Sequence, residues 1–477
     1  MKIALVASEA APFIKTGGLG DVMQGLPAAL SRIPENEVVL ILPYYGVMKR
    51  NPQIKTEFIT SFAVDLAWRK CHVGLFRLKS RKKLQVYFVD NEQYFNRDRI
   101  YGEGDDGERF AFFSKAVPAC LNALGFWPDV LHCNDWQTAL IPVLMKTEFA
   151  GAFPYTRTVF TIHNVEYQGW AGREFNYDVL GLPGEVTDML DLKGCTNFMK
   201  GAVVAADMVT TVSETYAQEL RHPYFAHGMD EVFQWYPEKM RGITNGIDSE
   251  AFDPGKDARL TKTYTYRDFE EGKAANKLAL QAELGLEQDR DVALLSIVTR
   301  LVSHKGIDLL TAIADRMMSR RVQFVLLGTG DAQYEEFFRA LQEKYPGRVA
   351  SVLLFDGGLA NRIYAASDLY LMPSKSEPCG LSQIIAMRYG TVPVVHAVGG
   401  LRDTVWPYDP ECEKGRGYTF QSYNAEDFLG SIDRALNLYY DFPEKFRALQ
   451  RSDMRQDFGW KEPAKRYMEL FHHILGK

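Results

Sequence analysis

The sequence predicts an α/β protein made of two doubly wound, Rossmann-like domains. Its 477 residues exceed what one hydrophobic core usually serves. Short, continuous apolar runs alternate with helix-like stretches along the whole chain, and the runs form two series. Continuous apolar runs are typical of parallel strands that helices cover on both faces. The composition, 46% hydrophobic and 24% charged, is that of an ordinary globular protein.

The first series of apolar runs predicts the strands of an N-terminal domain over residues 1–245. These strands are Ile3–Ala7, Val38–Leu42, Leu84–Val89, Val130–His132, Thr158–Ile162 and Met208–Val212.

The second series predicts a C-terminal domain over residues 246–457. A polar stretch, Asp257–Asp291, is expected to be a helical linker that leads into it. The strands that follow are Val292–Val298, Val322–Leu327, Val352–Phe355, Leu369–Met372 and Val392–Val395.

The apolar pattern of residues 458–477 predicts a closing helix. Its apolar positions recur at helical spacing, and Pro463 falls in the first turn, where proline is tolerated. The apolar positions are Trp460, Ala464, Tyr467, Phe471 and Ile474.

The charge and hydropathy of the sequence argue against nucleic acid and membrane as partners. The formal net charge is -6, whereas a nucleic-acid-binding protein normally carries a basic surplus. The apolar run after Lys2 is too short for the core of a signal peptide, and no run approaches the length of a membrane span. Cysteines are few and scattered, which favours reduced thiols. We therefore expect a cytoplasmic protein that binds neither nucleic acid nor membrane.

A glycine-rich turn, Lys15-Thr16-Gly17-Gly18-Leu19-Gly20-Asp21, follows the first predicted strand. Ligands of open α/β sheets bind at the carboxyl ends of strands. Glycines there let the backbone approach a phosphate, and the following helix contributes its positive end. On spacing alone, a plain glycine turn with a surface lysine explains the segment equally well.

Two loops of the second domain suggest a diphosphate and sugar site. Arg300 and Lys305 flank the loop after the first strand of that domain, where two cations suit a leaving diphosphate. Glu377 precedes a tight turn whose amides and hydroxyl, at Gly380, Leu381 and Ser382, would meet an anion. The alternatives are that the two cations are solvated surface residues and that Glu377 only caps a helix.

Polar residues also follow two strands of the first domain. Asp135 and Trp136 come after one strand and His163-Asn164 after another. Aromatic faces cover the C–H faces of sugars, while carboxylates and amides bind the hydroxyls. These elements together favour carbohydrate recognition.

In this order, the motifs KTGGLGD, HCNDWQ, TIHN, NGID and SEPCGLSQ resemble those of bacterial glycogen synthases and plant starch synthases. The resemblance covers essentially the whole chain. It implies the GT-B architecture, in which two Rossmann-like domains face each other across a cleft and the closing helix crosses back to the first domain. It also implies a retaining glycosyltransferase that moves glucose from ADP-glucose to the non-reducing end of an α-1,4-glucan.

The resemblance further implies the roles of individual residues. Lys15, Arg300 and Lys305 would hold the diphosphate, Glu377 the glucose hydroxyls, and the His163 carbonyl would lie near the anomeric carbon. Phe355 would stack on the adenine. The remaining substrate-binding positions would be Gly18, Asp21, Asp135, Asn164, Asn245, Cys379, Gly380, Leu381 and Ser382. We expect no metal or cofactor, because Arg300 and Lys305 can stabilise the leaving diphosphate, and Asp289-Arg290-Asp291 is interpreted as a chance DxD sequence.

Three alternatives remain open. The first is a catalytically silent glucan-binding protein on the same fold, although Lys15, Arg300, Lys305 and Glu377 are intact. The second is a related retaining transferase with another donor or acceptor, since the sequence leaves the choice between ADP- and UDP-glucose open. The third is a nicotinamide oxidoreductase, which Gly328-Thr329-Gly330 suggests only weakly, because Gln333 occupies the third glycine position.

Overall fold

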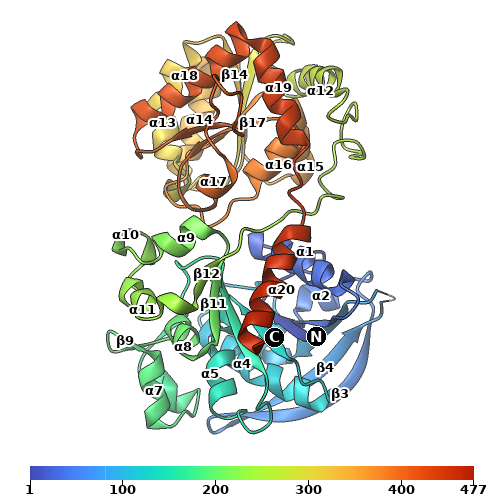
Figure 1. The fold of residues 1–477 in the computed structure, drawn as a ribbon, viewed down its shortest axis with the longest axis vertical. Helices are drawn as coiled ribbons and strands as arrows, with labels where there is room; N and C mark the ends of the chain where they lie inside the picture. The colour runs from blue at the N-terminus through green and yellow to red at the C-terminus, as the bar shows by residue number, and fades with distance from the viewer. Residues whose placement is uncertain (81) are drawn as a thin grey trace. The chain divides into compact units, whose positions relative to one another are not determined.

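The computed structural model describes residues 1–80 and 82–477, which form two compact units (Figure 1). Unit 1 comprises Met1–Gly246 and Trp460–Lys477, and unit 2 comprises Ile247–Gly459. Each unit is built on a mainly parallel sheet with flanking helices, so the predicted α/β class with two doubly wound domains is confirmed.

The large sheet of unit 1 has the strand order β12-β11-β7-β6-β1-β2-β5-β4-β3. All neighbours from β12 to β5 pair in parallel, and only β4 and β3 are antiparallel. The chain starts at the centre with β1 and moves outwards first on one side and then on the other, which is the doubly wound order. Its strands are β1 Lys2–Val6, β2 Glu37–Pro43, β3 Thr56–Leu66, β4 Arg69–Leu78, β5 Gln85–Asp90, β6 Val130–Asn134, β7 Arg157–Ile162, β11 Met208–Thr211 and β12 Met240–Gly242.

Short helices and a small second sheet, β8-β10-β9, complete unit 1. The strands of the small sheet are β8 Trp170–Ala171, β9 Asp191–Leu192 and β10 Cys195–Asn197. The helices are α1 Gly18–Arg32, α2 Gly46–Lys49, α3 Glu92–Phe95, α4 Asp106–Ala123, η1 Trp136–Thr138, α5 Leu140–Lys146, α6 Phe175–Asp178, α7 Gly184–Leu190, α8 Phe198–Ala205, α9 Glu214–Glu219, α10 Pro223–Ala226, α11 Asp230–Trp235, η2 Pro237–Lys239 and α20 Lys461–Leu475.

Unit 2 has one parallel sheet in the order β15-β14-β13-β16-β17-β18, again doubly wound from its centre. Its strands are β13 Ala293–Val298, β14 Val322–Leu327, β15 Val349–Val352, β16 Leu369–Met372, β17 Val392–His396 and β18 Tyr418–Phe420. Its helices are α12 Phe269–Glu283, η3 Ser303–Lys305, α13 Ile307–Met318, α14 Ala332–Lys344, α15 Gly357–Ala366, α16 Ser382–Arg388, α17 Gly399–Thr404, α18 Ala425–Asp441 and α19 Pro443–Met454.

Helices cover both faces of the unit 2 sheet, with α13, α14 and α18 on one side and α12 and α15 on the other (Figure 1). Neighbouring strand residues point to opposite faces. Accordingly, Leu295 packs in the cluster that contains α13 and α18, whereas Leu294 packs with α12 and α15. Because both faces are covered, these strands are apolar throughout, as the sequence pattern indicated.

The C-terminal helix α20 packs within unit 1, beside α1 (Figure 1). The rings of Tyr467 and Phe471 lie 5.3 and 5.9 Å from that of buried His132 on β6. Trp460 covers Gly25 of α1 so closely that a Cβ atom there would come within 1.9 Å of the indole nitrogen. The predicted closing helix is therefore confirmed as part of the unit 1 core.

Three expectations for the elements were wrong. The strand predicted at Val352–Phe355 ends at Val352, and Phe355 is 94% exposed in the following loop. The linker Asp257–Asp291 is helical only over α12. The antiparallel pair β3–β4 was missed, because its solvent-facing side chains interrupt the apolar pattern. No helix in the described ranges is long and apolar enough to cross a membrane.

Candidate functional site

Each sheet contains one point where the strand order reverses, and the predicted site residues lie mainly in the loops there. In unit 2 this point lies between β13 and β16, and in unit 1 between β1 and β6. Loops that leave neighbouring parallel strands at such a point diverge and open a crevice beyond the carboxyl ends of the strands. The two half-sites are described separately below.

The unit 2 half-site is centred on an ion pair between Lys305 and Glu377. Lys305 Nζ donates to Glu377 Oε2 at 2.6 Å, and the Ser374 hydroxyl donates to the same oxygen at 3.0 Å. The side chains of Lys305 and Glu377 are only 18% and 9% exposed. A cation and a carboxylate from two different loops are thus held together where the strand order reverses.

Backbone contacts hold these two loops against each other. The Lys375 amide donates to the His304 carbonyl at 2.9 Å, and His396 lies 2.8 Å from the Ser374 carbonyl through Nδ1. Gly306 has φ of 75°, and a Cβ atom there would come within 2.0 Å of the Pro373 carbonyl oxygen. Only glycine allows this close approach, so Gly306 fixes the position of the backbone next to Lys305.

The turn after Glu377 is set by Gly380 and Gln383. Gly380 has φ of 69°, which favours glycine. The Gln383 amide nitrogen donates to the carbonyls of Cys379 and Gly380 at 3.1 and 2.9 Å. Leu381 is the N-cap of α16, which starts at Ser382, as the sequence predicted, and Cys379 is buried beneath the turn. Gln383 was not predicted from sequence, although it belongs to the same motif.

Arg300 and Phe355 are exposed in the loops that follow β13 and β15. Both therefore lie at the carboxyl edge of the unit 2 sheet, where the prediction put them. Exposed guanidinium and aromatic groups are available to a ligand with an anionic part and a planar ring.

In unit 1, the glycine-rich turn leads directly into α1, which begins at Gly18. Lys15 Nζ forms an ion pair with Asp21 Oδ1 at 2.7 Å, and both side chains are partly exposed. The turn predicted from sequence is therefore present, with Lys15 and Asp21 in contact.

Glu9 was not predicted as a site residue, yet it organises this turn. Its carboxylate is buried and accepts hydrogen bonds from the Thr16 amide and hydroxyl at 2.6 and 2.7 Å. Burial raises the pKa of Glu9, and the bonds from Thr16 partly oppose that increase. Its position directly after β1 was the available signal. The carboxylate fills the start of α1, where the sequence alone suggested a phosphate.

Asp135 joins the loops after β6 and β7. Its Oδ1 accepts from the His163 amide at 2.7 Å and from the Asn164 amide at 3.4 Å. Burial raises the pKa of Asp135 to about 7, against the effect of these amides. Asp135 also has φ of 58°, an uncommon backbone conformation that is found at functional sites.

His163 is held in one orientation by Asn134. Its Nε2 lies 3.0 Å from Asn134 Oδ1, which can only accept, so Nε2 carries the proton. Burial lowers the pKa of His163 to about 3, so the ring is neutral at pH 7. Asn134, a second residue missed from sequence, is buried and anchored by its amide nitrogen to the Val6 carbonyl at 3.1 Å.

Asn245 lies just beyond β12 and is buried, and its Oδ1 has no hydrogen-bond partner among the described residues. A buried amide oxygen without a partner is costly and points to a ligand or water. Arg466 of α20 binds the Gly242 carbonyl nearby at 2.9 Å. The closing helix therefore supports the loop that carries Asn245.

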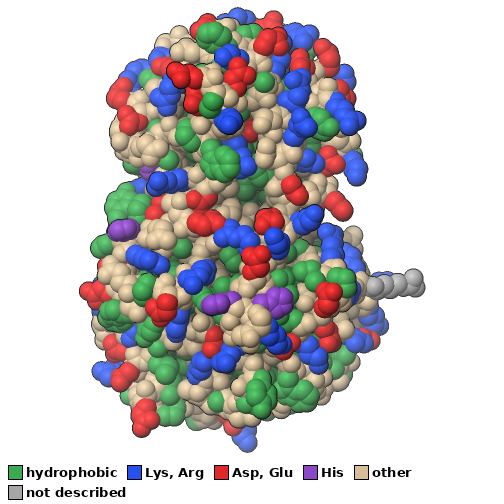
Figure 2. Space-filling model, in the orientation of Figure 1, with side chains coloured by type: hydrophobic (Ala, Val, Ile, Leu, Met, Phe, Trp, Pro, Cys, Tyr) green, Lys and Arg blue, Asp and Glu red, His purple; other side chains and the backbone are tan. Residues whose placement is uncertain are grey.

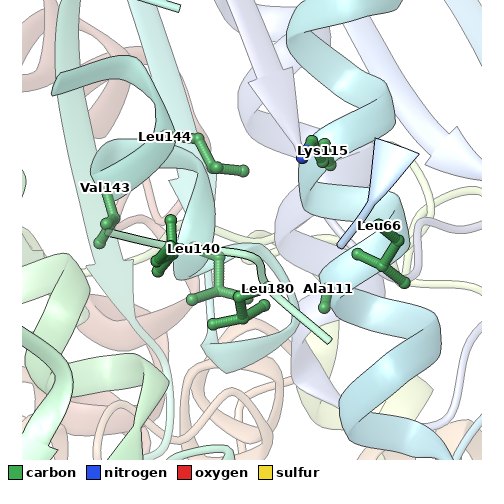
Figure 3. A pocket seen from close by; sticks show the side chains of 8 residues that line it. Leu66, Ala111, Lys115, Leu140, Val143, Leu144 and Leu180 are labelled. Carbon is green, nitrogen blue, oxygen red and sulfur yellow. The ribbon is translucent and has the colours of Figure 1, made fainter. Parts of the chain in front are cut away.

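An apolar cavity in unit 1 does not belong to this half-site. Figure 3 shows leucines and Ala111 around it, with Lys115 at its edge. It encloses about 10 Å³, close to the minimum for a single water molecule. Lys115 pairs with Glu148 at 2.9 Å. This cavity is a packing defect that is too small for a substrate.

Comparison with known families gives two matches along the chain. Residues 2–235 match the family described as starch synthase catalytic domain. Residues 281–452 match glycosyl transferases group 1.

Curated relatives resemble the chain over its full length. The glycogen synthase of Alkaliphilus metalliredigens is 43% identical over 99% of this chain and 100% of its own length. The glycogen synthase of Exiguobacterium sibiricum is 44% identical over 99% of both chains.

Among solved structures, the catalytic domain of starch synthase IV from Arabidopsis thaliana, bound to ADP and acarbose, superposes with a TM-score of 0.91. It is 34% identical and covers 100% of this chain and 99% of its own. Sucrose-phosphate synthase from Thermosynechococcus elongatus, at 20% identity and a TM-score of 0.61, covers 100% of this chain and 99% of its own and shares the fold.

Proposed function

Since the chain belongs to the glycogen and starch synthase family and is a glycosyltransferase that makes glucans, we propose that it uses ADP-glucose as its donor. It transfers glucose, with retention of configuration, to the non-reducing end of an α-1,4-glucan. Glycogen or a maltooligosaccharide is the acceptor, and no metal or cofactor takes part.

The observation that carries this proposal is the Lys305–Glu377 pair beside exposed Arg300, at the reversal of strand order in unit 2. Breaking the anomeric C–O bond places negative charge on the leaving diphosphate. Lys305 and Arg300 provide fixed positive charge where that charge develops, and removal of one such donor costs roughly 100- to 1000-fold in rate. In the unit 1 half-site, Lys15 is the partly exposed cation of the glycine-rich turn.

Glu377 is a positioning residue for the glucose hydroxyls. One of its oxygens already accepts from both Lys305 and Ser374, which supports a fixed acceptor rather than a nucleophile. Retention then follows if the acceptor hydroxyl attacks from the side of the departing phosphate, to which it gives its proton. A trapped glucosyl ester on Glu377 would contradict this assignment.

The unit 1 residues suit the sugar and acceptor side of the reaction. Because Nε2 of His163 donates to Asn134 and the ring is neutral, the imidazole is a poor candidate for a general acid at pH 7. The loop is fixed by the amides of His163 and Asn164, which donate to Asp135, and we assign the role near the anomeric carbon to the His163 backbone carbonyl instead. Phe355 offers an exposed face for the adenine ring.

The test is incorporation of labelled glucose into glycogen from ADP-glucose or UDP-glucose, with and without a chelator. We expect strong incorporation from ADP-glucose that the chelator does not reduce. Lys305→Ala should reduce kcat/KM roughly 100- to 1000-fold.

Lys344→Ala is the matched control, because Lys344 forms an exposed ion pair with Asp315 and lies at the C-terminal end of α14, opposite the end of that helix that follows the strand. Preference for UDP-glucose would overturn the donor assignment. Glycogen binding without incorporation from either donor would instead indicate a silent glucan-binding protein.

A further inference from the structure

A second, larger cavity lies in unit 2 at the amino ends of the strands, whereas the half-site lies at their carboxyl ends. It occupies about 370 Å³, within the range of small-molecule sites. We call it the α12–α19 cavity, and it is lined by residues of α12, α18 and α19 and by residues that precede β13, β14 and β16. The six residues of β13 separate its mouth from Arg300 by about 20 Å along the strand.

Two lysines inside the cavity are engaged by the fold. Lys273 donates to the carbonyls of Ala365 and Tyr389 at 3.0 and 3.1 Å. Lys277 pairs with Asp368 at 2.6 Å and donates to the Val292 carbonyl. The inner charges thus hold the ends of helices and strands, whereas the charged side chains nearer the mouth form more exposed ion pairs with one another or with neighbouring acids.

The mouth of the cavity carries both signs of charge. Three arginines and three carboxylates line it: Arg290, Arg321, Arg447, Glu270, Glu271 and Asp291. Figure 2 shows Lys and Arg side chains interspersed with Asp and Glu side chains over the visible face of unit 2. A strongly anionic ligand would meet the carboxylates. A neutral ligand rich in hydroxyls would meet both donors and acceptors, because the pairs Arg290–Glu271 and Arg447–Glu270, at 3.8 and 3.7 Å, are exposed and long enough to exchange for contacts with hydroxyls.

Aromatic rings supply the apolar part of the lining. Tyr439 packs against Tyr440 and Phe446, with ring centres 4.9 and 5.1 Å apart. Rings beside guanidinium and carboxylate groups are the combination that sugars require, since the rings cover C–H faces and the polar groups bind hydroxyls.

We propose that the α12–α19 cavity binds a segment of the glucan acceptor away from the reacting chain end. This inference rests on the proposed function, because it takes the acceptor to be a glucan. A branched polymer can occupy both places at once, so a second site raises its effective concentration at the first. A three-glucose acceptor is too short to reach both.

The test compares glycogen with maltotriose as acceptors at saturating ADP-glucose. Ala274→Trp would fill the cavity, and Arg290→Ala would remove one charge from its mouth. The matched controls are Ala282→Trp, an exposed position on the same helix, and Arg339→Ala, since Arg339 and Arg290 are 56% and 57% exposed.

We expect both cavity variants to raise KM for glycogen about 5-fold or more, as loss of one of two linked sites predicts. Their constants for maltotriose and those of both controls should stay within about twofold of the wild type, because a monovalent acceptor gains nothing from linkage. An unchanged KM for glycogen in both cavity variants would overturn the proposal. An equal rise in KM for maltotriose would also overturn it, since the substitutions would then impair the reaction site itself.

A second measurement separates this inference from the proposed function. Electrophoresis in native gels that contain glycogen measures binding without a donor. If the wild type is retarded more than both cavity variants, the glucan site stands even when no glucose is transferred. Equal retardation of all proteins would refute the site whatever the activity.

Discussion

Lys305 and Glu377 are separated by 72 positions in the chain and meet only because neighbouring strands carry their loops. Their ion pair is largely buried, and such pairs are costly to desolvate unless other polar groups support them. Ser374 provides that support on the carboxylate. A donor diphosphate would supply further hydrogen-bond acceptors for the Lys305 ammonium group. Donor binding would therefore stabilise the Lys305–Glu377 ion pair.

Asp135 makes a prediction about pH. Because burial raises its pKa to about 7, the folded protein keeps a proton there that the unfolded chain loses above about pH 4. The contribution of Asp135 to the free energy of unfolding therefore falls as pH rises from about 4 to about 7, by at most about 1.4 kcal/mol per pH unit. Asp135→Asn should remove this loss, so its melting temperature relative to the wild type should rise between pH 5 and pH 7.5. A constant difference between the two proteins would contradict the raised pKa.

Gly306 makes a prediction about backbone geometry. Gly306→Ala meets both a positive φ and the Pro373 carbonyl, whereas Gly285→Ala meets only a positive φ, 69°, in open space. The conformational cost alone is about 1–2 kcal/mol. We expect thermal unfolding to show a larger loss of stability for Gly306→Ala, and only that variant to lose activity through displacement of Lys305. Equal losses of stability and activity in the two variants would contradict this prediction, because the backbone would then accommodate a Cβ atom beside the Pro373 carbonyl.

Many candidate site residues could be located because they follow apolar runs within a few positions. His163 comes directly after such a run, and Asp135 and Glu377 follow the ends of other strands in short loops. Glu9 was missed although it also follows a strand, since its function depends on folding back to Thr16, a contact that spacing does not reveal. Which charges pair and which remain exposed depends on three-dimensional packing, and the Lys15–Asp21 pair could not be predicted.

Helix α20 shows how one element can complete the core of a distant part of the chain. Phe471 is fully buried against His132, whereas Lys465 on the same helix is mostly exposed. Phe471→Ala should reduce the free energy of unfolding by about 3–5 kcal/mol, as loss of a buried phenylalanine usually does. Lys465→Ala should change it by less than about 0.5 kcal/mol. Urea unfolding measures both, and equal small effects would show that α20 is only loosely docked.

The strands that helices cover on both faces were predicted well, because burial makes them continuously apolar. The β3–β4 pair has one exposed side, so its alternating pattern did not fit the search for apolar runs. Val352–Phe355 shows the opposite error. An apolar sequence continues past the end of β15, and Phe355 is exposed, a position that suits ligand binding better than packing.

On the scale of the whole molecule, both units have a doubly wound sheet with one reversal of strand order, and the candidate residues follow the carboxyl ends of the strands in each. Hydrogen exchange with ADP should therefore show its strongest protection in residues 299–306 and 374–383 of unit 2. Amides of α14 should be unaffected and serve as the internal control. Protection that survives in Lys305→Ala, or that is strongest elsewhere, would contradict the assignment of the diphosphate site.

Because α20 belongs to unit 1 but follows all of unit 2 in the chain, the ribosome makes this part of the first core only after it has made unit 2. A nascent chain that has reached residue 459 contains every strand of both sheets, yet the surface that receives Trp460, Tyr467 and Phe471 is still bare. Unit 2 can complete its fold before α20 is made, whereas unit 1 must keep an open apolar face until α20 has left the ribosome. During that interval this face is where a chaperone would bind.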